Sequence, residues 1–205
     1  MRRFLCRAFG KNITVIAFVA VLLGGLITGA PGLWAAESSM PVPASPQPAK
    51  LNPGLAVGYY VKLFRSVEEV QDWAKYKDAY AGEPLHSLNY RSGPDAVLTS
   101  GQEDGIGAHI TGFIRFDEPG TYAIAAQSND GLDVNIGGVT VVYDPDVHAD
   151  RYSQPVEIEI KTAGWYPLEA WYFERRNTST LRMFWLKPDE EEGSMTVVPK
   201  DAYGH

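Results

Sequence analysis

Short runs of alternating apolar and polar residues recur through most of the chain after residue 55. In the clearest run, Val156, Ile158 and Ile160 alternate with Glu157 and Glu159, which is the pattern of a strand with one buried and one solvated face. Further strands, separated by turns, are predicted at residues 59–64, 109–116, 121–127, 132–136, 139–143, 165–174 and 181–186. Short strands with turns at a spacing of roughly ten residues indicate an all-β fold, either an antiparallel sandwich or a barrel.

One stretch has helical periodicity instead. Ser66 and Glu69 have the spacing of a capping box, in which each side chain satisfies a free backbone amide at the start of a helix. Apolar residues then recur at helical spacing, at Val67, Val70, Trp73, Ala74 and Tyr80. Gly82 and Pro84 end this run. One short helix near residues 66–81 is therefore expected at the edge of the β-structure.

Residues 1–36 have the order of a secretory signal peptide. The basic residues Arg2, Arg3, Arg7 and Lys11 come first, an apolar stretch follows, and cleavage is expected after Ala35 or Ala36. The protein is therefore predicted to be exported to the periplasm, the cell surface or the medium. The alternative is an uncleaved membrane anchor at residues 13–30, because the apolar run nearly reaches spanning length.

Two further segments follow the signal peptide. Residues 37–52 are rich in Pro, Ala and Ser and have no periodic pattern, so an extended, flexible linker is expected. Residues 53–205 have the right length for one domain. The only cysteine is Cys6, in the signal peptide, so the domain must be held together by its core without disulfides.

The charge of the exported part limits its partners. Removal of the first 36 residues lowers the number of Lys and Arg side chains from 18 to 14 against 25 acidic side chains, so the formal net charge becomes −11. Nucleic acids and anionic lipid surfaces require basic patches, and such acidity argues against both. Contact with a membrane is therefore expected only through an uncleaved N-terminal segment, whereas cation binding is compatible with the charge.

Several motifs, in order, resemble the PA14 domain family, named after a fragment of the anthrax protective antigen. Gly58-Tyr59-Tyr60 is similar to the opening strand of the family, and Thr111-Gly112-Phe113 to a later strand. The most specific block is Ser128-Asn129-Asp130-Gly131, preceded by Pro119-Gly120-Thr121-Tyr122 and followed by Ile136-Gly137-Gly138. Gly164-Trp165-Tyr166-Pro167 and Leu181-Arg182-Met183-Phe184-Trp185 match a block near the end of the family pattern. The resemblance covers roughly residues 54–205.

This resemblance implies an antiparallel β-sandwich of jelly-roll type and, most often, carbohydrate binding. PA14 domains occur in yeast adhesins, glycosidases, bacterial surface proteins and toxins, and some serve only as structural modules. The resemblance also implies that Trp165 and Trp185 are core residues. The partner of this protein is accordingly expected to be a glycan or another component of the cell envelope.

The loop at Asn129, Asp130 and Gly131 is the first candidate site. In sugar-binding members of the family, two consecutive acidic residues joined by a cis peptide hold calcium here, and the calcium binds sugar hydroxyls. By resemblance, Asn129 and Asp130 are the candidate calcium ligands, with Asn129 providing a neutral oxygen in place of a carboxylate. The alternative is a simple turn, because Asn-Asp-Gly is a common turn sequence.

A second candidate loop follows the strand at 139–143. Asp146, His148 and Asp150 place two carboxylates and an imidazole within five residues, so they could ligate a metal ion or line a sugar site. The alternative is a solvated loop with no ligand. His109 stands alone at a strand and is expected to have a structural role.

The sequence contains no recognisable catalytic motif. No nucleophile elbow, phosphate-binding loop or HExxH pattern is present, and Glu169 and Glu174, the only candidate acid/base pair, belong to no motif. The protein is therefore predicted to be a non-catalytic carbohydrate-binding module, assisted by calcium. Two alternatives stay open: a structural or protein-interaction module of the cell envelope without sugar binding, and an accessory subunit of an enzyme.

Overall fold

The computed structural model describes residues 40–93, 95–191 and 193–205. The predicted signal peptide and the alternative anchor at residues 13–30 lie outside these ranges. No helix within the described ranges is both long enough and apolar enough to cross a membrane.

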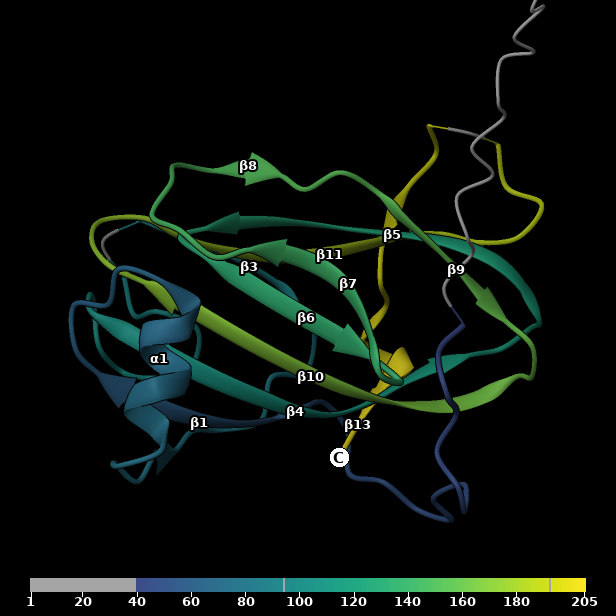
Figure 1. Cartoon of the computed structure of the whole chain (residues 1–205), viewed down its shortest axis with the longest axis horizontal. Helices are drawn as coiled ribbons and strands as arrows, with labels where there is room; N and C mark the ends of the chain where they lie inside the picture. Colours follow the sequence, from purple (N-terminus) through teal and green to yellow (C-terminus); the bar gives the residue numbers. More distant parts are fainter. Residues whose placement is uncertain (1–39, 94, 192) are drawn as a thin grey trace, which may run out of the picture. The chain divides into compact units, whose positions relative to one another are not determined.

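The described chain consists of strands, one α-helix and one short 3-10 helix (Figure 1). The helices are α1 (Val67–Ala74) and η1 (Lys200–Ala202). The strands are β1 (Ala56–Val61), β2 (Tyr80–Ala81), β3 (Asn89–Ser92), β4 (Ile106–Phe116), β5 (Gly120–Asn129), β6 (Leu132–Ile136), β7 (Val139–Asp144), β8 (Arg151–Tyr152), β9 (Val156–Ile160), β10 (Gly164–Glu174), β11 (Ser179–Leu186), β12 (Thr196–Val197) and β13 (Tyr203–Gly204).

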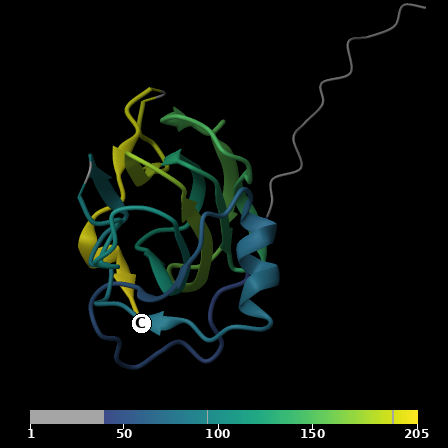
Figure 2. The same ribbon diagram turned by 90° about the vertical axis from the view of Figure 1, so that its left-hand side faces the viewer.

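The strands form two antiparallel sheets. The first sheet has the order β2-β1-β4-β10-β6-β7, and β13 also pairs with β4. The second sheet has the order β12-β11-β5-β8, with β3 paired to β11 and β9 paired to β5. Figure 2 shows the sheets surrounding the interior and α1 outside them. The predicted antiparallel β-sandwich is therefore confirmed.

Alternation along β10 decides which residues enter the core. Leu168, Ala170 and Tyr172 point between the sheets and are at most 2% exposed. Trp171 and Phe173 lie on the opposite face, where Phe173 is buried beneath α1 with Val67 and Val70. The sandwich thus has a main core between its sheets and a second, smaller core under the helix.

The outer face of the first sheet carries a further aromatic contact. The ring of His109 on β4 stacks on that of Trp171 on β10, with ring centroids 3.8 Å apart and an angle of 8° between the planes. Nε2 of His109 also lies 2.8 Å from a carboxylate oxygen of Glu169. His109 therefore connects neighbouring strands.

Helix α1 begins where the sequence predicts but ends earlier. The hydroxyl of Ser66 accepts a hydrogen bond from the backbone N–H of Glu69 at 3.3 Å, as expected of an N-cap. The Glu69 carboxylate does not complete the capping box, because it binds the side chain of Lys62 and the backbone N–H of Arg65. The helix ends at Ala74, and Tyr80 belongs to β2, where it pairs with Tyr59.

The short helix has a packing reason. After Ala74, Tyr76 is 81% exposed and Ala79 is exposed, so neither adds a buried apolar face to the helix. A helix gains most of its stability from packing an apolar face, so the last predicted turns have nothing to hold them.

Residues 40–52, which we call the strap, pack on the sandwich. The N–H of Val42 donates to the carbonyl of Gly137 at 2.8 Å, and that of Ala44 donates to the carbonyl of Trp165 at 2.9 Å. Asn52 and His205 exchange two backbone hydrogen bonds of 2.8 and 2.9 Å. The described part of the predicted linker thus packs on the sandwich through backbone hydrogen bonds.

Trp165 is held by the strap and does not belong to the core. The N–H of Trp165 donates to Oε1 of Gln47 at 2.7 Å, and Nε2 of Gln47 donates back to the carbonyl of Trp165 at 3.0 Å. Its neighbour Tyr166 points into the main core, so Trp165 itself faces outward and is partly exposed. The core position implied by the family resemblance is therefore wrong for Trp165, whereas Trp185 is a core residue with 3% exposure.

Gly107 on β4 allows α1 to approach the sheet, so its replacement tests the second core. A Cβ atom at Gly107 would lie 2.7 Å from both Phe64 and Val70, closer than carbon atoms can pack. We expect Gly107→Ala to lower the free energy of unfolding by about 1–3 kcal/mol, measured by urea denaturation.

Gly93→Ala is the matched control, because nothing lies within 4 Å of a Cβ atom at Gly93. We expect that variant to unfold within about 0.5 kcal/mol of the parent protein. Equal stability of the Gly107 and Gly93 variants would contradict the close packing of α1 on β4.

Candidate functional site

The loop at Asn129 and Asp130 lies where β5 ends and β6 has not yet begun. The peptide bond between the two residues is cis, as in the family loop that the sequence resembles. Asn129 is 8% exposed and Asp130 is 4% exposed, so both polar side chains are buried. Buried polar groups need hydrogen-bond partners, and these partners define the site.

The Asp130 carboxylate is bound by backbone amides from two other loops. Its Oδ1 accepts from the N–H of His148 at 3.1 Å, and its Oδ2 accepts from the N–H of Arg175 at 2.8 Å. Burial raises the pKa of Asp130, and these two amides oppose that shift because they favour the charged form. Asp130 thereby joins the loop after β7 to the loop after β10.

Asn129 is bound to a second carboxylate. Its Nδ2 donates to Oδ1 of Asp150 at 3.1 Å and to the hydroxyl of Thr178 at 3.0 Å. The hydroxyl of Thr180 donates to the same oxygen of Asp150 at 2.9 Å. The other carboxylate oxygen, Oδ2, pairs with Arg91 at 3.1 Å. Asp150 therefore binds three side chains, which come from the three strands β3, β5 and β11.

The pairing of the second sheet explains why these residues meet. Strand β11 lies between β3 and β5, and Thr180 stands opposite Arg91 on one side and Asn129 on the other. The three residues thus form one row across the sheet, and Asp150 directly precedes β8, which pairs with the end of β5. We call Arg91, Asn129, Asp150, Thr178 and Thr180 the loop-end site.

The site is partly open to solvent. The side chain of Asp150 is 23% exposed and that of Arg91 is 68% exposed, whereas Thr180 is fully buried. Asn129 and Thr180 therefore hold the carboxylate of Asp150 from its buried side, while its other side stays accessible to solvent.

The remaining predicted residues have different positions. Gly131 is buried, and a Cβ atom there would lie 2.5 Å from both Phe173 and the carbonyl of Pro145, so the position requires glycine for packing. Asp146 is exposed and forms a β-bridge with Ser66, beside α1 and outside the loop-end site. Asp146 is therefore not brought together with the other predicted residues.

His148 contributes its backbone, not its ring, to the Asp130 contact. The ring is 5% exposed, with Nδ1 2.8 Å from the carbonyl of Ala149 and Nε2 3.2 Å from a carboxylate oxygen of Asp144. Asp144 also binds Arg151, which lowers the pKa of that carboxyl. His148 thus stabilises the loop after β7.

Two ionisable side chains lie in the interior next to the loop. The hydroxyl of Tyr172 donates to the backbone carbonyl of Asn129 at 2.6 Å. Glu174 is fully buried; its Oε2 accepts from the N–H of Gly105 at 3.2 Å, and its Oε1 has no partner among the described residues. Burial, and secondarily the charge of Asp104, raises the pKa of Glu174 to about 7.

Glu169 and Glu174 do not form an acid/base pair. They are five residues apart on β10, a separation of about 17 Å along a strand, and they lie on opposite faces of it. Glu169 is exposed and binds His109, whereas Glu174 is buried at the end of the strand.

Calcium would need roughly six to eight oxygens that converge on one point. A carboxylate can only accept hydrogen bonds, so the Asn129 amide turns its nitrogen, and not its oxygen, toward Asp150. In the ranges that the structure describes, no three His, Cys, Asp or Glu side chains are close enough to hold a metal ion. The residues as they are arranged do not fit a calcium ion.

Sequence reasoning missed Arg91, Thr178 and Thr180. They lie about 40 to 50 residues from Asn129 in the sequence and belong to no local motif. Only the register of β3, β11 and β5 brings them together. The one available signal was the predicted strand at residues 181–186, which would have had to be extended by two residues and paired correctly.

The chain is similar to known proteins in its sequence pattern and in its fold. The family model described as the PA14 domain matches residues 96–197. None of the curated proteins matches the sequence significantly. The sequence similarity is therefore to the family as a whole.

Three solved structures illustrate the likeness of fold. The PA14 domain of the MpAFP antifreeze protein has a TM-score of 0.64 at 15% identity, covering 77% of this chain and 92% of that chain. The PA14 sugar-binding domain from an RTX adhesin has a TM-score of 0.58 at 16% identity, covering 75% of this chain and 98% of that one.

The third is the A domain of epithelial adhesin 9 from Candida glabrata in complex with Galβ1-3GlcNAc. It has a TM-score of 0.61 at 16% identity and covers 82% of this chain and 95% of that chain. At such low identity, these structures show a shared fold alone.

The buried Glu174 gives a testable pH dependence. Its pKa is raised from the ordinary value of 4.5 to about 7, so between these values the folded chain keeps a proton that the unfolded chain releases. The free energy of unfolding therefore falls as pH rises through this window, and the loss persists at higher pH. The raised pKa of Asp130 acts in the same direction.

Glu174→Gln keeps the shape and stays neutral, so it removes this contribution. We expect the variant to gain stability over the parent protein as pH rises from about 5 to 8, by on the order of 2–3 kcal/mol in urea denaturation. Glu157→Gln, at an exposed strand position, is the control and should show no such trend. Parallel pH profiles of the Glu174 variant and the parent protein would contradict the assignment.

Proposed function

The chain belongs to the PA14 domain family, and on this premise we propose that it is an exported, non-catalytic module that binds carbohydrate at the loop-end site. The observation that carries the proposal is the fixed carboxylate of Asp150. It is held by Asn129 and Thr180 from the interior, is paired with Arg91, and remains 23% exposed.

This arrangement suits a sugar hydroxyl. A carboxylate whose position is set before binding accepts a hydroxyl hydrogen bond without an ordering cost, and hydrogen bonds to charged groups are stronger than neutral ones. The guanidinium of Arg91 offers donors beside it, and the exposed Thr178 contributes a hydroxyl. The end of the second sheet thus presents both hydrogen-bond acceptors and donors. Vicinal sugar hydroxyls can bind to both kinds of group.

The similar structures support the same class of ligand. The RTX adhesin domain is named as sugar-binding, and the epithelial adhesin domain was solved with a galactose-containing disaccharide. The predicted signal peptide supports export. A non-catalytic role is supported by the separation of Glu169 and Glu174 along β10.

We further propose that calcium is not required. In a calcium site the cation holds together carboxylates that would otherwise repel one another. Here position 129 is a neutral amide, which adds no negative charge and holds the carboxylate of Asp150 by a hydrogen bond while it donates another to the hydroxyl of Thr178. Both oxygens of Asp130 already accept backbone N–H groups.

Asp150→Asn tests the binding site. The new amide would place donors against the Asn129 amide, the Thr180 hydroxyl and Arg91, so we expect glycan affinity to fall roughly tenfold or more. A glycan array would first identify a bound sugar, and isothermal titration would then compare the variants.

Asp146→Asn is the matched control, since it makes the same chemical change in the same loop at an exposed residue outside the site. It should bind as the parent protein does. Equal binding by the Asp150 variant with an intact fold would refute the site. Absence of binding to any glycan by the folded protein would refute the function and leave the envelope interaction module.

Calcium removal tests the second point. We expect the melting temperature and glycan affinity of the parent protein to be the same in calcium and in EDTA. Asn129→Asp replaces the bridging amide with a carboxylate that faces Asp150, so that variant should be less stable in EDTA and should recover when calcium is added. A calcium-dependent rise in the melting temperature of the parent protein would contradict a metal-free site.

A further inference from the structure

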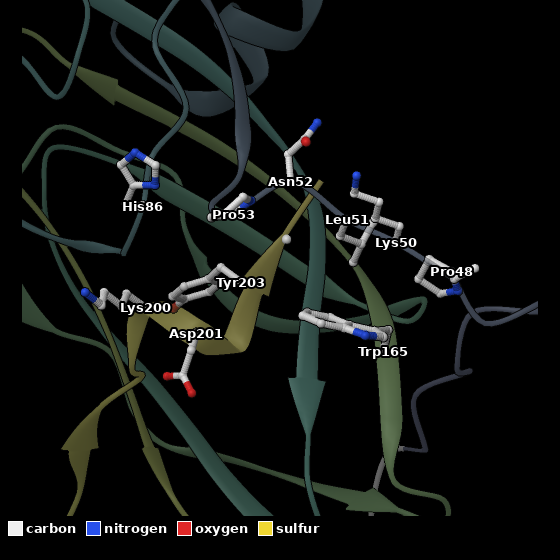
Figure 3. A pocket seen from close by; sticks show the side chains of 12 residues that line it. Pro48, Lys50, Leu51, Asn52, Pro53, His86, Trp165, Lys200, Asp201 and Tyr203 are labelled. Carbon is white, nitrogen blue, oxygen red and sulfur yellow. The ribbon is translucent and has the colours of Figure 1, made fainter.

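A pocket lies far from the loop-end site. It has a volume of about 870 Å³ and is lined by the end of the strap, Trp165, and the C-terminal residues around Tyr203 (Figure 3). Trp165 is near the start of β10, and Arg175, which binds Asp130, follows its end. They are ten positions apart along an extended chain, a distance of about 33 Å, so the pocket and the loop-end site are distinct.

The walls of the pocket are fixed by hydrogen bonds. Gln47 binds both backbone groups of Trp165, and Asn52 exchanges two hydrogen bonds with His205. Tyr203 pairs with Ile114 of β4. Each wall is thus attached to the sheet, and a pocket of this size falls within the range of roughly 300–1,000 Å³ that is usual for small-ligand sites.

The lining combines apolar walls with charged groups at the opening. The apolar surface comes from Pro48, Leu51, Pro53, Trp165 and Tyr203. Figure 3 shows Lys50 and Lys200 on opposite sides of the pocket, Lys50 with the strap and Trp165, and Lys200 beside Tyr203.

Positive charge is in excess at this opening. The lining has two lysines against one acidic residue, Asp201, which lies 3.7 Å from the guanidinium of Arg115; Arg115 also pairs with Asp117 at 2.7 Å. Both Lys50 and Lys200 are exposed, and no ion pair of either is found among the described residues. On a domain with a formal charge of −11 in its exported form, two such lysines at one pocket make a local site for an anion.

The indole of Trp165 limits the shape of the ligand that the pocket can bind. It is partly exposed and the guanidinium of Arg115 lies over its ring, with Cζ 5.4 Å from the ring centroid. The face of an aromatic ring is negative, so it attracts the polarised C–H bonds on the flat side of a sugar ring. Asn52 and His86 at the opening supply further polar groups for hydroxyls.

We propose that this pocket binds an acidic sugar, a pyranose that carries a carboxylate. Its ring lies against Trp165, and its carboxylate is attracted by the positive charges that Lys50 and Lys200 place at the pocket. The site does not depend on the loop-end site or on the function assigned to it.

Glucuronate, glucose and phenylacetate are suitable probes. Glucose has the same ring as glucuronate without the carboxylate, and phenylacetate has the carboxylate without the sugar ring. We expect glucuronate to bind more tightly than both and to shift the indole N–H resonance of Trp165, and not those of Trp73, Trp171 or Trp185, in NMR titrations of the purified protein.

Two variants separate the contributions. Lys50→Gln combined with Lys200→Gln should weaken glucuronate binding about fivefold to tenfold and leave any glucose binding unchanged, whereas Lys77→Gln, an exposed lysine on another surface, should have no effect. Trp165→Leu should weaken both sugars, with thermal melting to confirm the fold.

The proposal fails if no probe binds, if glucose binds as tightly as glucuronate, or if the double lysine variant behaves like the parent protein. Phenylacetate binding as tight as that of glucuronate would also overturn the assignment to a sugar, because the pocket would then select only a ring with a carboxylate.

Discussion

The antiparallel pairing of β4 with β10 is the interaction on which the rest of the structure depends. It runs without a break over eleven residues, from Gly164 opposite Phe116 to Glu174 opposite Ile106. One face of this pair closes the main core, and the other supports α1 and the stacked rings of His109 and Trp171. Its two ends hold the two polar regions of the molecule. The distance between the loop-end site and the pocket at Trp165 is therefore set by the length of one pair of strands.

Buried polar groups at the loop end are stabilised by hydrogen bonds to one another. Asn129, Thr180 and Arg91 all donate to Asp150, and two backbone amides donate to Asp130. The hydrogen bonds of such a network become stronger where water is excluded, because electrostatic attraction increases in a medium of low polarity. Glu174 is the exception: one of its oxygens has no partner among the described residues, and burial raises its pKa.

The sequence contains enough information for most of the fold. Alternation located the long strands, and Ser66 marked the start of the helix. Strands β2, β3, β8, β12 and β13 were missed because a strand of two to four residues has no measurable alternation. The strap was missed for another reason: Val42, Ala44 and Asn52 bind through backbone groups, which every sequence has. Trp165 was misplaced by analogy, although its alternation with Tyr166 indicates the outward face.

The candidate site was only half predictable. Asn129, Asp130 and Asp150 stand out because they are polar residues in loops next to strands. Arg91 and Thr180 become partners only through the register of three strands that are far apart in sequence, and register depends on the packing of the whole sheet. The same limit applies to Asp146, which resembles its neighbours in sequence but lies beside α1.

The strap has a consequence for the order in which the molecule is completed during synthesis. Its partners occur later and later in the chain: Val42 binds Gly137, Ala44 binds Trp165, and Asn52 binds His205. As the chain is made from its N-terminus, each of these contacts must wait until its partner has been made, and the contact of Asn52 must wait for His205. The segment that is made first in the described structure is thus among the last to be fixed in place.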